Sequence, residues 1–326
     1  MKYPNPDSKS AALFEQAQSV LTDGGSRSTI RIAPYSIYLS AAKGKYVTDV
    51  DGNRLFDFNN NYTSMLHGHA HPTIVEAAFN QIECGTGYSF GCEPEYKLAN
   101  LICDRVDSFD KIRFMNSGSE AVMKAIKAAR AYTGRPKIAK CENAYHGSYD
   151  FAEVSLAVEP TDLTVNNPIS KPYSEGTPQA VLDNVVVIPH SDPVIARQIL
   201  DQHAQDLAAV LIDPIGLSMA RIPHTDEFFA MVHDFCKASD ALFIADEVIC
   251  GFGRTGNMFG TQTFNLEPDM ICIAKALSSA YLPISGLMVN EKIYDVIRSN
   301  SDKIGLFGHG FTYGGHPVPA AVALET

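Results

Sequence analysis

The chain has 326 residues, of which 45% are hydrophobic and 19% charged, and its formal net charge at pH 7 is −11. This composition is typical of a globular protein with one large core or two domains. The acidic balance argues against a surface that binds nucleic acid or an anionic membrane. The start of the chain, MKYPNPDSKSAALFEQ, lacks the apolar run of a signal peptide, so we expect a cytoplasmic location. The seven scattered cysteines contain no Cys-x-x-Cys pair, which is typical of free thiols in a reducing compartment.

The first 65 residues differ from the rest of the chain. A helical pattern around Ser10–Leu21 ends at a double-glycine break. The segment GKYVTDVDGNRLFDF that follows reads as a hairpin, with Asp51 and Gly52 as a strong turn signal. We expect residues 1–65 to form an N-terminal segment, part of a small domain, that packs on a large domain of residues 66–326.

From about residue 112 onward, short apolar runs alternate with helical patterns such as residues 120–132 and 227–240. Strands that are covered on both faces give nearly continuous apolar runs. The alternation therefore predicts an α/β fold with a mostly parallel central sheet sandwiched by helices. The expected strands cover residues 112–116, 137–143, 185–189, 208–213, 242–248, 270–274 and 285–289.

The chain ends at HPVPAAVALET, which reads as the first turns of a helix. Natural domains seldom end inside a helix. We therefore expect a truncated C-terminus, with a C-terminal small domain missing.

The segment NSGSEA (116–121) lies between a predicted strand and a strongly helical stretch. Small residues at such a junction leave the first backbone N–H groups of the helix free, and the helix dipole favours an anion there. Ser117 with Glu120 three residues later is also the pattern of an ordinary capping box. The motif alone fits a phosphate site and a helix cap equally well.

Two charged residues end consecutive apolar runs. Asp246 stands at the C-terminal end of a buried strand, where α/β folds bind ligands, although it also fits a helix cap or a partner for Arg254. Lys275 ends the next run, and a lysine in apolar surroundings is disfavoured unless it is paired or reactive. With a phosphate site at the helix start, these residues form the set that a pyridoxal 5′-phosphate site needs: a lysine for the imine and a carboxylate for the pyridine nitrogen.

With these motifs, the chain resembles the class III (ornithine/ω-type) aminotransferases, which are pyridoxal-phosphate enzymes of fold type I. The matching pieces occur in family order and at family-like spacing. They are YVTDVDGNRLFDF, HGHAHP (67–72), NSGSEA (116–121), YHG (145–147), DEV (246–248), GFGRTG (251–256), KAL (275–277) and FTYGGHP (311–317).

The resemblance implies a role for each matching residue. Lys275 forms the Schiff base with the cofactor and then moves a proton between the substrate Cα and the cofactor C4′, while Asp246 pairs with the pyridinium. Thr312 resembles a residue that reaches the phosphate of the neighbouring subunit, which implies an obligate homodimer. The other implied cofactor contacts are Ser117, Gly118 and Ser119 at the phosphate, and Tyr145 and Val248 on the two faces of the ring.

Two further motifs suggest other kinds of site. GFGRTG (251–256) satisfies the dinucleotide-binding pattern, but the stretch after it is a poor helix and offers no helix N-terminus for a pyrophosphate. His67, His69 and His71 would share one face of a strand, as metal ligands do, but Pro72 and the family's Gly-His-x-His-Pro pattern favour a structural turn. We expect neither a dinucleotide site nor a metal site.

Residues 25–31 resemble the glutamate-1-semialdehyde aminomutase branch and the related β-amino-acid aminotransferases. Arg31 falls where the aminomutase has its carboxylate-binding arginine, and Arg27 falls where the β-amino-acid enzymes have theirs. A guanidinium suits bidentate carboxylate recognition, although each arginine also fits an exposed loop. Tyr62 aligns with an aromatic that flanks the aminomutase substrate, and it fits a core position equally.

The resemblance implies a transaminase that moves an amino group between a carboxylate-bearing amine and a keto-acid or other carbonyl acceptor by ping-pong chemistry. Two departures affect the specific assignment: Asp213 replaces the usual glutamate, and residues 215–220 lack the Asn-Met-Gly of the aminomutase. The alternatives are an aminomutase, a decarboxylase or racemase of the same family, and a non-catalytic scaffold. The intact Lys275, Asp246 and Tyr145 argue against a scaffold.

Overall fold

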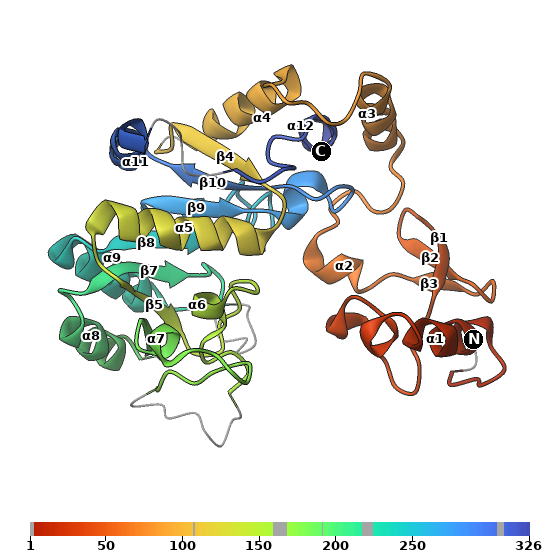
Figure 1. The fold of residues 1–326 in the computed structure, drawn as a ribbon, viewed down its shortest axis with the longest axis horizontal. Helices are drawn as coiled ribbons and strands as arrows, with labels where there is room; N and C mark the ends of the chain where they lie inside the picture. Colours follow the sequence, from red (N-terminus) through yellow and green to blue (C-terminus); the bar gives the residue numbers. More distant parts are fainter. Residues whose placement is uncertain (1–2, 107, 159–167, 191, 217–223, 305–309) are drawn as a thin grey trace.

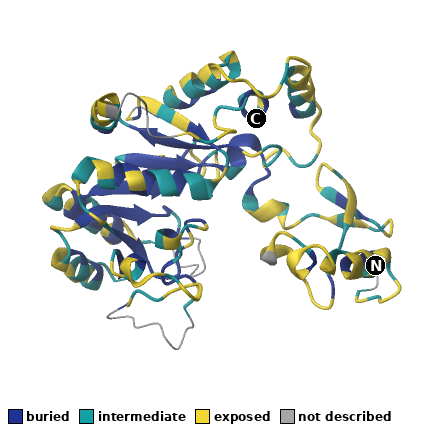
Figure 2. Cartoon of the chain, viewed as in Figure 1, coloured by how far each residue is buried: buried dark blue, intermediate teal, exposed yellow. Residues whose placement is uncertain are grey.

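The computed structural model describes residues 3–106, 108–158, 168–190, 192–216, 224–304 and 310–326. Within these ranges the chain forms two regions that lie side by side in Figure 1. One is built on a seven-stranded sheet and the other on a three-stranded sheet near the N-terminus. Figure 2 shows that most strands of the larger sheet are buried, with the edge strand β4 (Lys111–Met115) partly exposed, while much of the N-terminal region is exposed.

The seven-stranded sheet confirms the predicted α/β architecture. Its strand order is β4-β10-β9-β8-β7-β5-β6, and every expected strand is present within two residues of its predicted ends. The strands from β5 to β9 pair in parallel, whereas β10 runs antiparallel to both β4 and β9. The strands are β4 (Lys111–Met115), β5 (Lys137–Cys141), β6 (Val185–Ile188), β7 (Leu207–Ile212), β8 (Leu242–Asp246), β9 (Met270–Ile273) and β10 (Ser285–Val289).

Helices cover both faces of this sheet. The helix α5 (Gly118–Thr133) packs on one face, where the small side chains of Ala121, Ala125 and Ala129 are fully buried and let the helix approach the strands closely. The helices α8 (Pro193–Gln202) and α9 (Asp226–Ser239) cover the other face with larger apolar side chains. Each face of the strands therefore has its own apolar core, which explains their continuous apolar runs.

The N-terminal region begins with α1 (Lys9–Gln18), which is capped by the Ser8 hydroxyl and ends three residues before the predicted boundary. An antiparallel sheet follows, made of β1 (Leu39–Lys43), β2 (Tyr46–Asp49) and β3 (Arg54–Phe56). The predicted hairpin between β2 and β3 is present, and the Asp49 carboxylate accepts hydrogen bonds from the backbone N–H groups of its turn. The region joins the larger one through α2 (Asn60–Thr63) (Figure 1).

The remaining helices lie at the edges of the larger sheet or in its loops. The C-terminal helix α12 packs between α3 and α4, at the upper right of Figure 1. Across the described ranges, no helix combines the length and the apolar character that crossing a membrane requires. All seven cysteines are free, as expected. These helices are α3 (Pro72–Glu83), α4 (Glu93–Cys103), α6 (Asp150–Glu153), α7 (Gln179–Leu182), α10 (Gly260–Thr263), α11 (Glu291–Ile304) and α12 (Pro317–Glu325).

Candidate active site

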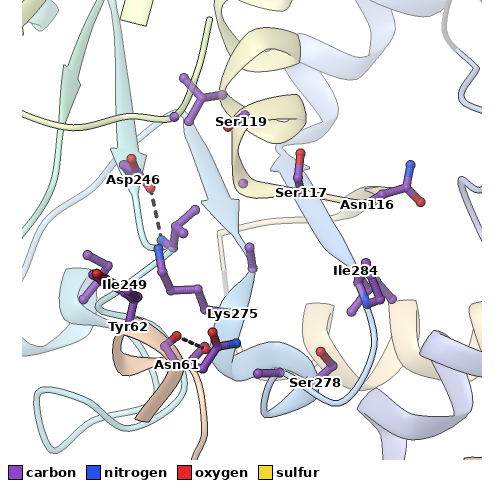
Figure 3. A pocket seen from close by; sticks show the side chains of 18 of the residues that line it. Asn61, Tyr62, Asn116, Ser117, Ser119, Asp246, Ile249, Lys275, Ser278 and Ile284 are labelled. Atoms are coloured by element: carbon purple, nitrogen blue, oxygen red, sulfur yellow. Dashed lines mark hydrogen bonds between the residues drawn. The ribbon is translucent and has the colours of Figure 1, made fainter. Parts of the chain in front are cut away.

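A cavity of about 370 Å³ opens where the parallel strands end. In α/β sheets, the loops at the carboxyl ends of the strands converge at this edge and form the usual ligand site. Loops after five strands and two N-terminal segments line the cavity. Figure 3 shows Asn61, Asn116, Asp246 and Lys275 among the residues around it. Its lining includes Arg27, Asn61, Tyr62, Asn116, Ser117, Gly118, Ser119, Tyr145, His146, Gly147, Asp213, Asp246, Val248, Lys275 and Ile284.

The start of α5 forms one end of the cavity. The Ser117 hydroxyl caps the helix by accepting a hydrogen bond from the Glu120 N–H at 3.2 Å, so the cap that the sequence suggested is present. The N–H groups of the first helical turn have no partner within the helix, and they carry the positive end of its dipole. Gly118 and Ser119 in that turn line the cavity, so one helix end provides both a cap and a place for an anion.

Two glycines keep this end of the cavity open. At Gly147 the backbone has φ +93°, and an added Cβ would lie 2.5 Å from the Ser119 Oγ. At Gly118 an added Cβ would lie 3.1 Å from both methyl groups of Val248. Glycine therefore lets the YHG loop and the Val248 side chain approach the helix start closely.

Asp246 lies deep in the cavity at the end of β8, with 6% of its surface exposed. Its Oδ2 is 2.7 Å from the His146 Nδ1, and its Oδ1 accepts a hydrogen bond from the Val248 N–H at 3.1 Å. The His146 ring is fully buried, and its Nε2 has no hydrogen-bond partner among the described residues. These contacts hold the Asp246 carboxylate in one orientation, and it faces the cavity.

Lys275 follows β9 and extends toward Asp246 in Figure 3. Burial lowers the pKa of its amine, and the nearby carboxylates Asp246 and Asp213 oppose part of that shift. Its backbone has φ 49°, a left-handed conformation that is uncommon outside glycine and often marks a functional site. A partly buried lysine with a lowered pKa offers a neutral amine more readily than a surface lysine does.

Asp213, at the end of β7, is a second buried carboxylate on the cavity floor. Its Oδ1 accepts hydrogen bonds from the Cys250 thiol at 3.0 Å and from the Ile215 N–H at 3.1 Å. Burial raises the pKa of this carboxyl group despite these donors. Residues 217–220, part of the stretch that departs from the aminomutase pattern, lie outside the described residues.

The N-terminal region contributes the opposite side of the cavity. Arg27 donates a hydrogen bond from Nη1 to the Asn61 Oδ1 at 2.8 Å, and its guanidinium carbon lies 5.5 Å from the centre of the Tyr62 ring. The turn α2, which carries Asn61 and Tyr62, has φ between 45° and 69° at all four residues. Asparagine tolerates left-handed backbone, but at Tyr62 and Thr63 it costs roughly 1–2 kcal/mol per residue, so this part of the turn is strained.

The sequence-predicted residues divide into two groups. Nine line one cavity, while Arg31 and Thr312 do not. The Arg31 Nε forms an exposed ion pair with the Asp23 Oδ2 at 2.8 Å, and Thr312 is exposed in the loop before α12. The nine are Arg27, Tyr62, Ser117, Gly118, Ser119, Tyr145, Asp246, Val248 and Lys275.

Sequence reasoning missed the parts played by His146, Asn61 and Cys250. His146 stands in the quoted YHG motif, yet its partner Asp246 is 100 residues away in the chain. Asn61 and Cys250 carry no pattern that distinguishes them from ordinary loop residues. The replacement of the usual glutamate by Asp213 was the one available signal of a changed contact at this position. The Cys250 thiol donates a hydrogen bond to that shorter side chain.

The two competing motifs have ordinary structural surroundings. GFGRTG (251–256) forms turns, and the next helix, α10, begins only at Gly260. The His69 Nε2 contacts the Asp57 carboxylate, the His67 Nε2 contacts the Thr326 carbonyl oxygen, and the His71 Nδ1 contacts the Thr73 hydroxyl. These three rings therefore point to different partners.

The residues of the cavity suit a flat ligand with an anionic end and a basic ring. The start of α5 can take an anion, and the buried Asp246 can pair with a protonated ring nitrogen. Tyr145 and Val248 supply an aromatic and an aliphatic surface, and the Lys275 amine can attack a carbonyl carbon.

Comparisons with known proteins point to one family. A family model described as aminotransferase class-III matches residues 30–326. The chain is 32% identical to a glutamate-1-semialdehyde 2,1-aminomutase from Methanopyrus kandleri, over 100% of this chain and 73% of that protein. Among solved structures, an omega-transaminase from Sphaerobacter thermophilus is 40% identical, with a TM-score of 0.92 over 99% of this chain and 73% of its own. A transaminase with PLP bound is 37% identical, with a TM-score of 0.88 over 97% of this chain and 72% of its own.

Proposed function

The chain belongs to the class III aminotransferases, which depend on pyridoxal 5′-phosphate, and on this basis we propose that it transfers an amino group from a carboxylate-bearing amine to a carbonyl acceptor by ping-pong chemistry. The observation that carries the proposal is one cavity that combines Lys275, Asp246, the start of α5 and Arg27. The first three fit the cofactor, and the last fits a substrate carboxylate.

The donor set fits the cofactor in charge and in shape. The N–H groups of Gly118 and Ser119 at the start of α5 suit the phosphate, because the helix dipole favours an anion there. Tyr145 and Val248 suit the two faces of a flat ring. When bound, the cofactor supplies an electrophilic carbonyl carbon and a ring that withdraws electrons from the substrate Cα.

Lys275 is the proposed catalytic base and the covalent anchor of the cofactor. Burial lowers the pKa of its amine, which favours the neutral form that acts as a nucleophile. With the cofactor bound, the Lys275 nitrogen would be placed to take a proton from the substrate Cα and to deliver it to the cofactor C4′ within the same half-reaction. The negative charge of Asp246 stabilises the protonated amine and so opposes part of this lowering of the pKa.

Asp246 is the proposed partner of the ring nitrogen. A buried carboxylate favours the protonated nitrogen, and a protonated ring attracts electrons from the substrate more strongly. The His146 Nδ1 and the Val248 N–H hold one oxygen each, so the carboxylate is fixed before the cofactor binds. His146 is therefore a proposed positioning residue.

Arg27 is the proposed carboxylate-binding residue. It lines the cavity beside Asn61 and Tyr62, and its guanidinium can take a carboxylate in bidentate fashion. Arg31 is paired with Asp23 outside the cavity, which makes it the less favoured candidate. This difference supports a β- or ω-amino acid donor, since the sequence links Arg27 to the β-amino-acid enzymes.

We also propose a homodimer in which Thr312 completes the phosphate site of the partner subunit. Thr312 is exposed and does not line the cavity of its own chain. Several large aromatic side chains are also exposed, which favours coverage by another protein surface. These are Phe58 at 87%, Phe79 at 63%, Phe90 at 90%, Tyr96 at 69% and Tyr313 at 66%.

Complementation tests the shared site. Thr312→Ala and Lys275→Ala chains are each impaired alone, but a mixed dimer contains one site with an intact Lys275 from one chain and an intact Thr312 from the other. Random mixing should give about half mixed dimers, each with one intact site. The activity averaged over all dimers should therefore reach about half that of one wild-type site. If Thr312 acts within its own chain, mixing recovers nothing.

The aminomutase is the second candidate, because the curated relatives carry that name. An aminomutase converts one molecule without a separate acceptor, whereas ping-pong transfer stops after one half-reaction until an acceptor is added. A screen of amine donors and keto-acid acceptors with the full-length protein separates the two. Turnover of glutamate 1-semialdehyde without an acceptor establishes the aminomutase, and the absence of a stoichiometric half-reaction with any carboxylate-bearing amine overturns the transaminase.

A further inference from the structure

A second group of ligand-type side chains lies at the carboxyl ends of β5 and β6, outside the lining of the cavity. Cys141 is the last residue of β5, His190 follows β6, and His224 precedes α9. The Cys141 sulfur and one ring nitrogen from each histidine lie within 4.8 Å of one another. None of the three residues lines the cavity or takes part in the proposed transfer reaction. From this convergence we propose that Cys141, His190 and His224 bind a thiophilic divalent transition-metal ion, with Zn²⁺ as its representative.

His190 has the hydrogen-bonding pattern that is common among metal-binding histidines. Its Nε2 hydrogen-bonds to the Glu142 carbonyl oxygen, which fixes the proton on that nitrogen. Its Nδ1 is buried and has no hydrogen-bond partner among the described residues. Metal-binding histidines commonly donate one ring N–H to a carbonyl group and coordinate through the other nitrogen. The bare Nδ1 of His190 therefore offers its lone pair to the cluster.

His224 is held in place by stacking. Its ring centre lies 4.5 Å from that of Phe228, with 8° between the planes, and 5.3 Å from that of His190. Its Nδ1 is 3.4 Å from the His190 carbonyl oxygen. His224 is only partly buried, so part of its surface is accessible to solvent.

The protonation states suit metal binding. Burial lowers the pKa of both His190 and His224 to about 4, although backbone carbonyl groups favour their protonated forms, so both rings are neutral near pH 7. Burial raises the pKa of the Cys141 thiol. A bound cation reverses that effect, so the thiol proton leaves for solvent as the sulfur–metal bond forms.

One thiolate and two imidazoles prefer Zn²⁺ or a similar transition metal over Mg²⁺ or Ca²⁺, which prefer oxygen ligands. A water molecule can take the fourth position of a tetrahedral site. The ion would link β5, β6 and the start of α9, three segments that are distant in sequence. That separation explains why spacing patterns in the sequence indicated no metal site.

Metal content tests this site independently of transaminase activity. The full-length protein, stripped with a chelator and then equilibrated with Zn²⁺ against a competing chelator, should retain about one ion per chain. X-ray absorption at the zinc edge should show one sulfur neighbour at about 2.3 Å and nitrogen or oxygen neighbours at about 2.0–2.1 Å. Cys141→Ser and His224→Gln should each weaken Zn²⁺ binding at least about tenfold.

Cys236→Ser is the matched control, because Cys236 is also a buried thiol of the same core. It should retain Zn²⁺ like the wild type. The proposal is overturned if wild-type protein holds no Zn²⁺ under competition, if the bound ion has no sulfur neighbour, or if Cys236→Ser loses Zn²⁺ as Cys141→Ser does. Should Cys141→Ser not fold, the sulfur neighbour in the wild type and the partly exposed His224→Gln variant decide the question.

Discussion

The cavity has two walls of opposite character. The buried wall consists of His146, Asp213, Asp246 and Lys275, which project from the ends of the central strands. The open wall consists of Arg27, Asn61 and Tyr62 from the N-terminal region, where Tyr62 is 39% exposed. Figure 2 shows the same contrast in the elements that carry them.

This contrast suggests a division of labour. In the buried wall, low dielectric strengthens each charge and hydrogen bond, and the contacts are set before any ligand arrives. In the open wall, solvent weakens each interaction, and the strained turn α2 carries two of the three side chains. We expect substitutions in the buried wall to slow all substrates alike, and substitutions in the open wall to change which substrate is preferred.

Lys275→Ala gives the largest expected effect. Without the amine, the chain has no covalent anchor for the cofactor and no base at the substrate Cα, so transfer from every donor should fall below detection. Borohydride reduction followed by mass spectrometry should find the cofactor attached to wild-type protein and absent from the variant. A covalent adduct on the variant would assign the anchor to another residue.

Asp246→Asn gives the next largest expected effect. Loss of a buried charge partner is worth roughly 3–5 kcal/mol, so proton removal from the substrate should slow by two to four orders of magnitude, as about 1.4 kcal/mol corresponds to tenfold. Stopped-flow half-reactions with a β-amino acid and with a simple amine should show the same loss. A rate within about threefold of wild type would remove Asp246 from the mechanism.

The buried wall was the more predictable of the two. Its strands have long apolar runs because both faces are covered, and Asp246 and Lys275 stand at the ends of such runs. The antiparallel direction of β10 could not be predicted in this way, since an apolar run does not show in which direction the strand lies in the sheet. Likewise, a hydrogen bond between His146 and a residue 100 positions away leaves no local pattern.

The open wall depended on features that a sequence pattern does not carry. Arg27 and Arg31 are four residues apart and looked equivalent, but an ion pair with Asp23 holds Arg31 outside the cavity. The left-handed turn of α2 contains Tyr62 and Thr63, which disfavour that conformation locally. Tertiary contacts therefore determine this wall, including the hydrogen bond from Arg254 to the Thr63 carbonyl oxygen.

Arg27→Ala tests the open wall directly. Loss of a bidentate charged contact typically costs roughly 2–4 kcal/mol, or about 30- to 1,000-fold in kcat/KM. The variant should show that loss with carboxylate-bearing donors and little change with a simple amine. Arg31→Ala is the matched control and should stay within about threefold of wild type for both. Equal losses with both kinds of donor, or a selective loss in Arg31→Ala, would contradict the assignment of Arg27.

His146 gives the smallest expected effect and the sharpest test of the division between the walls. Its Nδ1 lies 2.7 Å from the Asp246 Oδ2, so His146→Leu removes one hydrogen bond to a charged group and leaves that oxygen buried. Such bonds contribute roughly 1.5–3 kcal/mol, and because the Val248 N–H still holds the other oxygen we expect the lower end of that range, a fall in kcat of about tenfold. An asparagine amide nitrogen can occupy the position of Nδ1, so His146→Asn should recover most of that loss.

The pH profile of kcat gives a second readout for His146. It should shift in the leucine variant, because Asp246, the proposed partner of the ring nitrogen, loses a hydrogen-bond donor, and it should return in the asparagine variant, which restores that donor. Since His146 acts through Asp246 and not through the substrate, the loss must be the same for a β-amino acid and a simple amine. A loss confined to carboxylate-bearing donors would place His146 with the open wall and break the distinction between the two.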